Sequence, residues 1–310
     1  MKKIIKKSFS LLLVMFIVLL VGCKKEPLEK IKIIVPNGTP LVAVGDLLSN
    51  ENYEFEVVSG ADLLTAALLK KDYDVVIAPV TAASKLYLLK GIEYKFASVI
   101  TTGNNYLVTK SDSDKITDVN GKKVMAYGMN NTPDIVMKAV FELNSINANI
   151  EYQSSVNDVV PFFVNESSEY DYILTAEPTL TMLKLKHKLD LRVIDLQKEL
   201  SSEIEMIPQA GIFVLNSGKE REIKSFLKDV KANIEFLNKN SDKYYEKVSN
   251  NHEYFEKLGE EVLEASLKTS NIKYYSAKEN KETMDKYYNL LNKFNQSLLN
   301  GKTPDENFYY

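Results

Sequence analysis

The sequence predicts an α/β protein whose two lobes are each built from βαβ units, joined by crossover strands and followed by a helical C-terminal region. Three observations predict this fold class. Two strand-to-helix turns resemble each other, two buried strands that follow them also resemble each other, and residues from 219 onward have apolar side chains at helical spacing. Strands that alternate with helices are typical of βαβ units and of a largely parallel sheet.

The first strand-to-helix turn follows a β-rich run at residues 31–35. Pro-Asn-Gly-Thr-Pro, residues 36–40, interrupts that run before an apolar helical pattern begins. Thr39 then occupies the N-cap of the helix, and Pro40 occupies the first helical position, where a missing N–H has no intrahelical partner to lose.

The same construction returns in the second half of the chain. The β-like run 123–127 precedes Asn130-Asn131-Thr132-Pro133 and a second helical pattern. Residues 73–79 and 170–178 form the second matching pair, and each predicts a buried strand that leads into a helix start marked by Pro and Thr. Two matches in the same order indicate two lobes of similar design.

The repeat predicts the domain organisation. Residues 31–105 form lobe 1 and residues 106–215 form lobe 2, with apolar β-runs near 101–105 and 210–215 as crossing points between the lobes. Residues 216–310 form a helical region that we expect to pack mainly on lobe 1. In sheets of this kind ligands bind at the carboxyl ends of the strands. The two strand-to-helix turns and the two helix starts that follow the matching strands are therefore four candidate binding loops.

The N-terminus predicts export. Lysines precede an apolar run at residues 11–21, which is shorter than the roughly 20 residues that a membrane-spanning helix requires. The run ends in Leu-Val-Gly-Cys, which resembles the bacterial lipobox and predicts a signal peptide at residues 1–22, lipidation of Cys23 and a tether at residues 23–30. Cys23 is the only cysteine in the chain. The alternative is a plain signal anchor in which Cys23 has no role.

The composition is that of an ordinary globular protein, with 45% hydrophobic and 26% charged residues. A net charge of −3 is too small to indicate binding to nucleic acid or to a charged membrane surface. The sequence has no feature of a stable oligomer, and we expect a monomer.

Catalytic chemistry is not predicted, because no nucleophile with a base, metal cluster or phosphate loop is recognisable. His187 and His252 stand alone among charged residues on helical patterns. Gly301-Lys302-Thr303 lacks the upstream glycine of a phosphate loop, and Asp112 and Asp114 lack the later ligands of a calcium loop. We therefore expect no enzyme activity, no cofactor and no metal.

The chain resembles the type II periplasmic-binding-protein fold, and within it the nitrate, sulfonate and thiamine-precursor branch of ABC-transporter binding proteins. The residues that carry the resemblance are 36–40, 59–62, 73–81, 118–124, 130–133, 176–178 and 208–211. The resemblance implies a lipid-anchored receptor on the outer face of the bacterial cytoplasmic membrane. It implies a small molecule bound between the lobes, and an ABC permease with its ATPase as partners.

Mostly neutral side chains are expected beside the candidate binding loops. The expected ligand-binding residues are Asn37, Thr39, Pro79, Thr81, Asn104, Asn105, Tyr106, Tyr127, Asn130, Asn131, Thr132, Glu177 and Gln209. Each has a structural alternative: the threonines can cap helices, and the asparagines can form turns. Glu177 suits either a helix start or a ligand that carries an amino group.

The two arginines, Arg192 and Arg221, fall outside the predicted cleft loops, so the bidentate anion-binding fork is missing there. The preferred ligand is a pyrimidine-type or other heterocyclic vitamin precursor. One alternative is a sulfonate, nitrate or other small anion, because helix N-termini alone can bind anions. The sequence also allows an enzyme of the same fold that acts on a thiamine precursor, and an adhesin or sensory domain.

Overall fold

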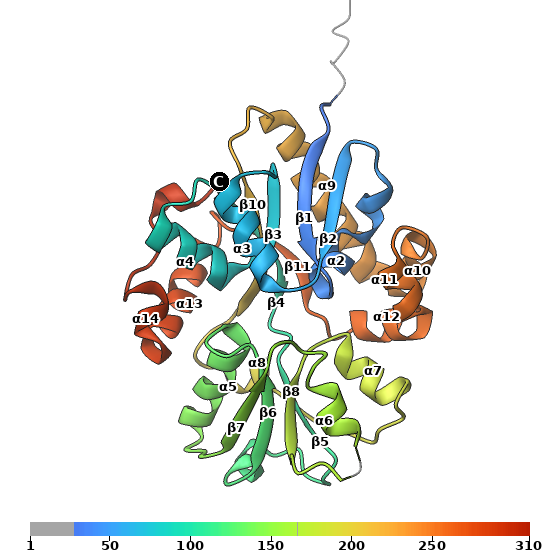
Figure 1. The fold of residues 1–310 in the computed structure, drawn as a ribbon, viewed down its shortest axis with the longest axis vertical. Helices are drawn as coiled ribbons and strands as arrows, with labels where there is room; N and C mark the ends of the chain where they lie inside the picture. Colours follow the sequence, from blue (N-terminus) through green and yellow to red (C-terminus); the bar gives the residue numbers. More distant parts are fainter. Residues whose placement is uncertain (1–27, 166) are drawn as a thin grey trace, which may run out of the picture.

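The computed structural model describes residues 28–165 and 167–310. The predicted signal peptide, Cys23 and the first part of the tether lie outside these residues. The described chain forms two lobes stacked along the long axis of the molecule, with the C-terminal helices beside the upper lobe (Figure 1). The predicted fold class is confirmed: each lobe is a mixed sheet with helices packed against it.

Lobe 1 contains a six-stranded sheet in the order β11-β4-β10-β3-β1-β2. Its core is the parallel unit β1, β2 and β3, and the remaining strands are antiparallel to their neighbours. The strands are β1 (Ile31–Pro36), β2 (Tyr53–Val58), β3 (Val75–Pro79), β4 (Lys95–Thr102), β10 (Pro208–Val214) and β11 (Ile272–Ser276).

Lobe 2 contains a five-stranded sheet in the order β7-β6-β8-β5-β9. Here β6 pairs in parallel with β7 and β8, as β1 does with β2 and β3 in lobe 1. The strands are β5 (Tyr106–Thr109), β6 (Lys123–Tyr127), β7 (Asn149–Gln153), β8 (Tyr172–Thr175) and β9 (Arg192–Asp195). The internal repeat that the sequence predicts is therefore a repeat of strand order and pairing.

The helices begin where the parallel strands end. The helices of the two lobes are α2 (Thr39–Val44), α3 (Ala61–Lys70), α4 (Val80–Lys90), α5 (Thr132–Leu143), α6 (Val160–Val164), α7 (Thr179–Leu185) and α8 (Leu196–Glu199). The C-terminal helices are α9 (Glu220–Lys239), α10 (Ser241–Val248), α11 (Glu253–Leu258), α12 (Glu260–Leu267), α13 (Lys281–Phe294) and α14 (Gln296–Leu299). Short 3₁₀ helices are η1 (Gly45–Ser49), η2 (Ile116–Val119) and η3 (Glu306–Phe308). The residues that the structure describes include no helix both long and apolar enough to cross a membrane.

The predicted boundary of lobe 2 is wrong at its C-terminal end. The prediction placed residues 106–215 in lobe 2, but β10 lies between β3 and β4 in the lobe 1 sheet. The chain returns to lobe 1 before Pro208, not at 210–215. A buried apolar strand has the same sequence pattern in either sheet, and only the long-range pairing decides which sheet it joins.

The C-terminal region also differs from the predicted helical region. It contributes β11 as an edge strand of the lobe 1 sheet, paired with β4. The amphipathic helix α9 buries Ile223, Phe226, Val230 and Ile234 against this lobe. However, α12 contacts α7 and α13 contacts α5, and both of these helices belong to lobe 2. The C-terminal region therefore reaches both lobes on opposite sides of the molecule (Figure 1).

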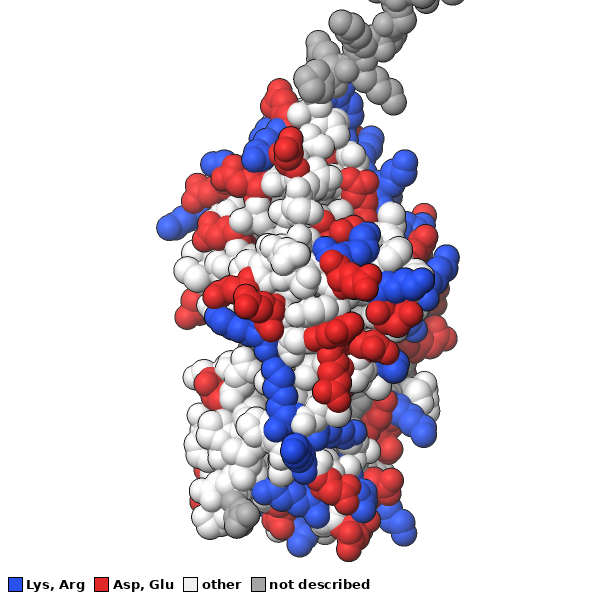
Figure 2. All heavy atoms as spheres, turned by 90° about the vertical axis from the view of Figure 1, so that its right-hand side faces the viewer, with Lys and Arg blue, Asp and Glu red and all other residues white. Residues whose placement is uncertain are grey.

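Charged side chains of both signs are interspersed on the face that Figure 2 shows, which includes parts of both lobes and the C-terminal helices. A surface with mixed signs produces little long-range field. The charges on this face therefore do not indicate a binding site, and the candidate site lies between the lobes.

Candidate functional site

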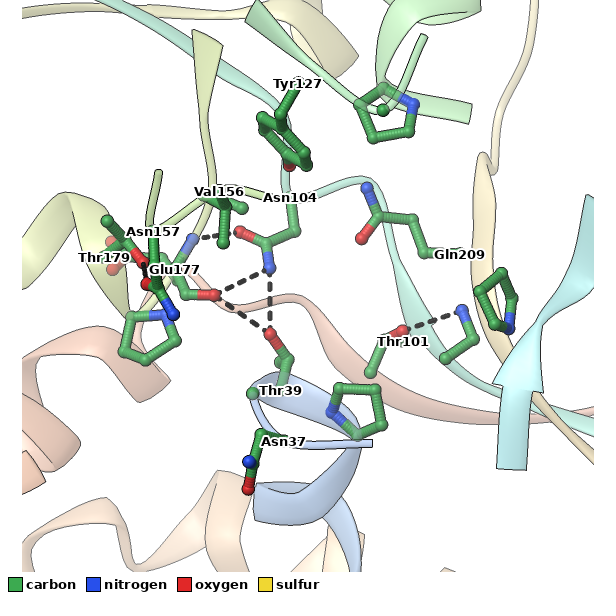
Figure 3. Close-up of a pocket in the computed structure, with 18 of the residues that line it drawn as sticks. Asn37, Thr39, Thr101, Asn104, Tyr127, Val156, Asn157, Glu177, Thr179 and Gln209 are labelled. Atoms are coloured by element: carbon green, nitrogen blue, oxygen red, sulfur yellow. Dashed lines mark hydrogen bonds between the residues drawn. The ribbon is translucent and has the colours of Figure 1, made fainter. Parts of the chain in front are cut away.

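A pocket of about 660 Å³ lies between the two lobes (Figure 3). It is lined at the starts of α2 and α4 from lobe 1, and of α5, α6 and α7 from lobe 2. The first backbone N–H groups of a helix have no intrahelical partner and carry a partial positive charge. The pocket thus lies at the carboxyl ends of the strands, where the sequence predicted a binding site.

Most of the predicted binding residues line this pocket. They are Asn37, Thr39, Pro79, Asn104, Tyr127, Asn131, Thr132, Glu177 and Gln209. They come from both lobes and from the crossing between β4 and β5, so the fold brings together segments that are far apart in the sequence.

Four predicted residues do not line the pocket. Thr81 is buried and hydrogen-bonds to Thr132. The Asn105 side chain is buried and accepts a hydrogen bond from Gln209. Tyr106 joins the apolar cluster of lobe 2 and donates its hydroxyl proton to the carbonyl of Thr269.

Asn130, the fourth of these residues, adopts a left-handed backbone conformation with φ of 60°. Its side-chain oxygen accepts a hydrogen bond from Asn295 of the C-terminal region at 3.2 Å. Asn130 therefore contacts the C-terminal region and is the chain neighbour of the lining residue Asn131.

Asn104 joins the two lobes at the back of the pocket. Its Oδ1 accepts from the backbone N–H of Glu177 at 2.6 Å, and its Nδ2 donates to the Glu177 carbonyl at 3.2 Å and to Thr39 Oγ1 at 3.0 Å (Figure 3). Thr39 Oγ1 in turn donates to the same Glu177 carbonyl at 3.0 Å. These groups satisfy one another, so they shape the pocket wall and leave few donors free for a ligand.

The threonines do not cap helices, which was the structural alternative for them. Gly38 is the N-cap of α2, Pro79 that of α4 and Asn131 that of α5, and none of these helices has a side-chain cap. Thr81 and Thr132 instead hydrogen-bond to each other at 2.8 Å across the two lobes. All three threonine hydroxyls therefore take part in contacts between lobes.

The Glu177 carboxylate serves the start of α7. Its Oε2 accepts from the backbone N–H of Thr181 at 3.0 Å, and its Oε1 accepts from the hydroxyl of Thr269 at 2.7 Å. Burial raises the pKa of Glu177, and the hydrogen bonds from Thr269 and Thr181 oppose that rise. Of the two roles expected for this residue, the geometry favours the helix start, because both oxygens already have partners within the protein.

Tyr127, Gln209 and Asn157 retain polar groups for a ligand. The Tyr127 hydroxyl has no hydrogen-bond partner within residues 28–165 and 167–310, and burial raises its pKa, so it remains a protonated donor at neutral pH. Gln209 Nε2 donates to Asn105 Oδ1 at 2.9 Å, which fixes the amide and leaves Oε1 as an acceptor. Asn157 Oδ1 accepts from Thr179 at 3.3 Å, which leaves Nδ2 as a donor.

The lining has little charge. Among its members only Glu177 has an acidic side chain and only Lys257 a basic one, and the Lys257 ammonium pairs with Glu253 at 2.8 Å on an exposed surface. Neither arginine lines the pocket. Much of the remaining wall is apolar, with Val156, Met182 and proline rings at the helix starts.

Several lining residues were not predicted. They are Gly38, Pro40, Ala82, Thr101, Gly128, Pro133, Ser154, Val156, Asn157, Val160, Ala176, Pro178, Thr179, Met182, Ala210, Tyr254, Lys257 and Leu258. Ser154, Val156 and Asn157 follow β7, so they could have been predicted from the rule that ligands bind at the carboxyl ends of parallel strands. The α11 residues Tyr254, Lys257 and Leu258 carry no such signal, because their place depends on how the C-terminal region folds back.

A metal centre has no support among the described residues, which include no group of three or more His, Cys, Asp or Glu side chains that could hold an ion. His252 caps α11 through Nδ1, which accepts from the backbone N–H of Tyr254. This contact gives His252 a structural role.

The chain matches no family model, and it matches none of the curated proteins. Solved structures do match it. An ABC transporter protein from Parabacteroides distasonis is 22% identical, with 91% of this chain and 98% of that chain covered and a TM-score of 0.77. The periplasmic aliphatic sulphonate binding protein from Escherichia coli is 12% identical, with 92% of each chain covered and a TM-score of 0.71.

A third match is the ligand-binding component of an ABC-type import system from Staphylococcus aureus. It is 15% identical, with 91% of this chain and 96% of that chain covered and a TM-score of 0.68. Identities this low establish the fold alone. The likeness confirms the periplasmic-binding-protein fold that the sequence resembled.

Proposed function

We propose that this chain is the extracytoplasmic substrate-binding component of an ABC importer. The observation that carries the proposal is the pocket between two lobes, lined by helix starts of both lobes at the carboxyl ends of their strands. Its solved structural neighbours include an ABC transporter protein, a periplasmic sulphonate binding protein and the ligand-binding component of an ABC-type import system. On this proposal the partners are a permease and its ATPase, and the chain is a monomer held at the outer face of the cytoplasmic membrane through acylated Cys23.

The mechanism follows from the position of the pocket. When the lobes separate at the β4–β5 crossing and at the segment before β10, the pocket opens to solvent. A ligand that contacts both lobes favours the closed form, because it binds that form more tightly than the open one. Exclusion of water then strengthens the hydrogen bonds around the ligand.

The preferred ligand is an uncharged or weakly charged heterocycle, such as a pyrimidine-type vitamin precursor. The walls are largely apolar and the lining lacks arginine. A flat ring with donor and acceptor groups on its edge suits the Tyr127 hydroxyl, the Gln209 carbonyl and the Asn157 amide. The buried Glu177 carboxylate is already hydrogen-bonded at both oxygens, which disfavours a role as the counter-ion of a strong cation.

A small anion, such as a sulfonate, is the second candidate. Three of the solved structural neighbours are sulfonate-binding proteins. The helix starts around the pocket provide backbone N–H donors that suit an anion even without arginine. An enzyme of the same fold has less support, because no Cys or His is among the lining residues.

A thermal-shift screen of the purified chain tests the proposal. The compounds are pyrimidines, thiamine, sulfonates, nitrate and amino acids. A ligand at a hundred times its dissociation constant adds about 2.7 kcal/mol to the free energy of unfolding. A shift with heterocycles supports the preferred ligand, a shift with sulfonates or nitrate alone replaces it with the anion, and a chain that no small solute stabilises contradicts the transport role.

Variants of the pocket locate the bound molecule. Tyr127→Phe and Gln209→Ala each remove one hydrogen bond to the ligand, so we expect each to weaken binding about fivefold to tenfold. Tyr170→Phe is the matched control, because Tyr170 donates its hydroxyl to Glu151 at the far end of lobe 2. Equal affinities in all three variants would place the ligand elsewhere.

Mass spectrometry of the protein made in bacteria tests the anchor. The proposal expects a mature chain that begins at acylated Cys23. An uncleaved and unmodified N-terminus would leave the binding role intact and remove the lipid anchor.

A further inference from the structure

Two neighbouring tyrosines of α13, Tyr287 and Tyr288, are both fully buried. Each hydrogen-bonds to a hydroxyl of α4 in lobe 1: Tyr287 to Thr81 at 2.7 Å and Tyr288 to Ser84 at 2.9 Å. Only Tyr287 also reaches lobe 2, where its hydroxyl lies 2.6 Å from Thr132 Oγ1 of α5. Two side chains of the same type and burial thus differ in whether their hydroxyl reaches the second lobe.

Thr81, Thr132 and Tyr287 form a closed triangle, because the Thr81 and Thr132 hydroxyls are themselves 2.8 Å apart. Three hydroxyls have three protons, which is the number needed for one hydrogen bond along each edge. Burial raises the pKa of Tyr287 to about 12, although the hydrogen bonds with Thr132 and Thr81 lower it, so the proton is retained at neutral pH. The triangle leaves no donor for a ligand at Thr132.

The triangle lies within a continuous apolar cluster. Ala83 of α4, Ile135 of α5 and Met284 of α13 belong to the same set of buried side chains, which extends from lobe 1 into lobe 2. The side chains of Thr81, Thr132 and Tyr287 are accordingly all buried. A separation of the lobes that carried Thr132 away with lobe 2 would break its bonds to Thr81 and Tyr287.

Two further contacts join the C-terminal region to lobe 2 on this side. Lys293 pairs with Glu142 at 3.2 Å, and Asn295 donates to Asn130 at 3.2 Å. Both contacts are exposed, and exposed ion pairs contribute little. Of the polar contacts named on this side of the pocket, only those of the triangle are buried.

We propose that Tyr287 is a positioning residue that holds the starts of α4 and α5 together and so favours the closed form of the pocket. Thr132 lines the pocket and Tyr287 does not, so Tyr287 acts through Thr132. The effect on lobe closure is independent of the ligand, and only its consequence for ligand retention rests on the proposed function. The C-terminal region would then set the closing equilibrium of the receptor as well as covering lobe 1.

Single-molecule energy transfer on the purified full chain in detergent tests this proposal without any ligand. Keto-bearing side chains at exposed Lys70 in lobe 1 and exposed Asn147 in lobe 2 carry the two dyes, so cysteine chemistry is not needed. We expect Tyr287→Phe to raise the ratio of open to closed molecules about fivefold, the amount that one net hydrogen bond supplies. Thr132→Val removes both bonds between the lobes and should raise the ratio further.

Tyr288→Phe is the control. It removes an equally buried hydroxyl from the same helix and leaves Ser84 without its partner, but it breaks no contact with lobe 2. We expect it to lower the melting temperature, as Tyr287→Phe should, while leaving the open fraction at the wild-type value. A ligand, once known, should dissociate faster from Tyr287→Phe and at the wild-type rate from Tyr288→Phe.

Equal open fractions in Tyr287→Phe and Tyr288→Phe would overturn the proposal, because both tyrosines would then act only on stability. If Tyr287→Phe does not fold, Thr132→Val gives the same comparison from the side of lobe 2, and a wild-type open fraction in that variant would also overturn the proposal. Failure to find a ligand in the thermal-shift screen bears on the proposed function and leaves this measurement unaffected.

Discussion

The first parallel units of the two lobes have the same local contacts, yet their surroundings differ. In lobe 1 the Asp74 carboxylate accepts from the backbone N–H of Lys32 at 2.9 Å, and in lobe 2 the Asp171 carboxylate accepts from Lys123 at 3.0 Å. The backbone N–H groups of these aspartates return the bond to the carbonyls of the same lysines. The repeat thus extends to individual hydrogen bonds.

The C-terminal region makes the difference. Lys219, just before α9, donates to Asp74 at 3.1 Å, and only 8% of the Asp74 side chain is exposed. Asp171 has 42% of its side chain exposed and a distant partner in Lys122 at 3.7 Å. The same motif is therefore a buried, paired carboxylate in one lobe and a solvated one in the other.

The largest expected difference is between Asp74→Ala and Asp171→Ala. Removal of Asp74 leaves the Lys32 N–H without its side-chain acceptor and removes the buried partner of the Lys219 ammonium, which keeps its bond to the Lys30 carbonyl. This variant should lower the free energy of unfolding by about 3 kcal/mol. Water can replace the exposed Asp171 carboxylate, so Asp171→Ala should lower the free energy of unfolding much less than Asp74→Ala does. Urea denaturation measures both, and equal losses would show that the covering of lobe 1 does not matter.

The pH dependence of the free energy of unfolding tests the role of the Asp74 carboxylate. Burial alone would raise the pKa of Asp74, but hydrogen bonds from Ser217, the Lys32 N–H and Lys219 hold it below its ordinary value. A lowered pKa means that Asp74 adds stability above its unfolded value of about 4, and that this stability is lost as the pH falls through the lower folded value. Below about pH 4, wild type and Asp74→Asn should therefore converge in stability, and a constant gap down to about pH 2 would contradict this.

The second largest difference is between the equivalent turn positions Gly38 and Asn131. Gly38 has φ of 100° and ψ of −153°, a conformation open mainly to glycine, whereas Asn131 has an extended backbone with φ of −113°. A Cβ at Gly38 would have space, with Pro40 Cδ at 3.9 Å, so the cost of Gly38→Ala is backbone strain of about 2 kcal/mol.

Asn131→Ala is the partner variant, and it should change the free energy of unfolding by less than about 0.5 kcal/mol, because its side chain is exposed and makes no capping hydrogen bond. Thermal unfolding of the two variants measures this difference. A Gly38→Ala variant as stable as wild type would mean that the turn can relax to a backbone conformation open to other residues.

The smallest expected difference is between Tyr73→Phe and Tyr170→Phe. Tyr73 donates to Glu56 on β2 and Tyr170 donates to Glu151 on β7, and both contacts are exposed. Each hydrogen bond to a carboxylate, with some burial, raises the pKa of its tyrosine to about 12. Both variants should lie within about 0.5 kcal/mol of wild type, and a large loss in one of them would reveal a difference between the lobes that the contacts do not contain.

The repeat, the strand-to-helix turns and most of the polar lining of the pocket could be predicted from the amino-acid sequence alone. These features depend on local pattern: apolar runs form buried strands, Thr-Pro marks a helix start, and the ends of parallel strands meet at one edge of a sheet. Asn104 and Thr132 could be predicted as site residues for this reason, but their hydrogen bonds to Glu177 and Tyr287 could not.

Three features depend on long-range packing: the sheet that β10 joins, the place where α11 meets the pocket, and the partners of the threonine hydroxyls. The sequence allowed helix capping for Thr39 and Thr132, and the structure gives both hydroxyls to contacts between lobes. A hydroxyl bonds to the nearest acceptor in space, and that acceptor here lies on another lobe or on the C-terminal region. Contacts between segments this far apart depend on the packing of the whole chain, for which local sequence carries no pattern.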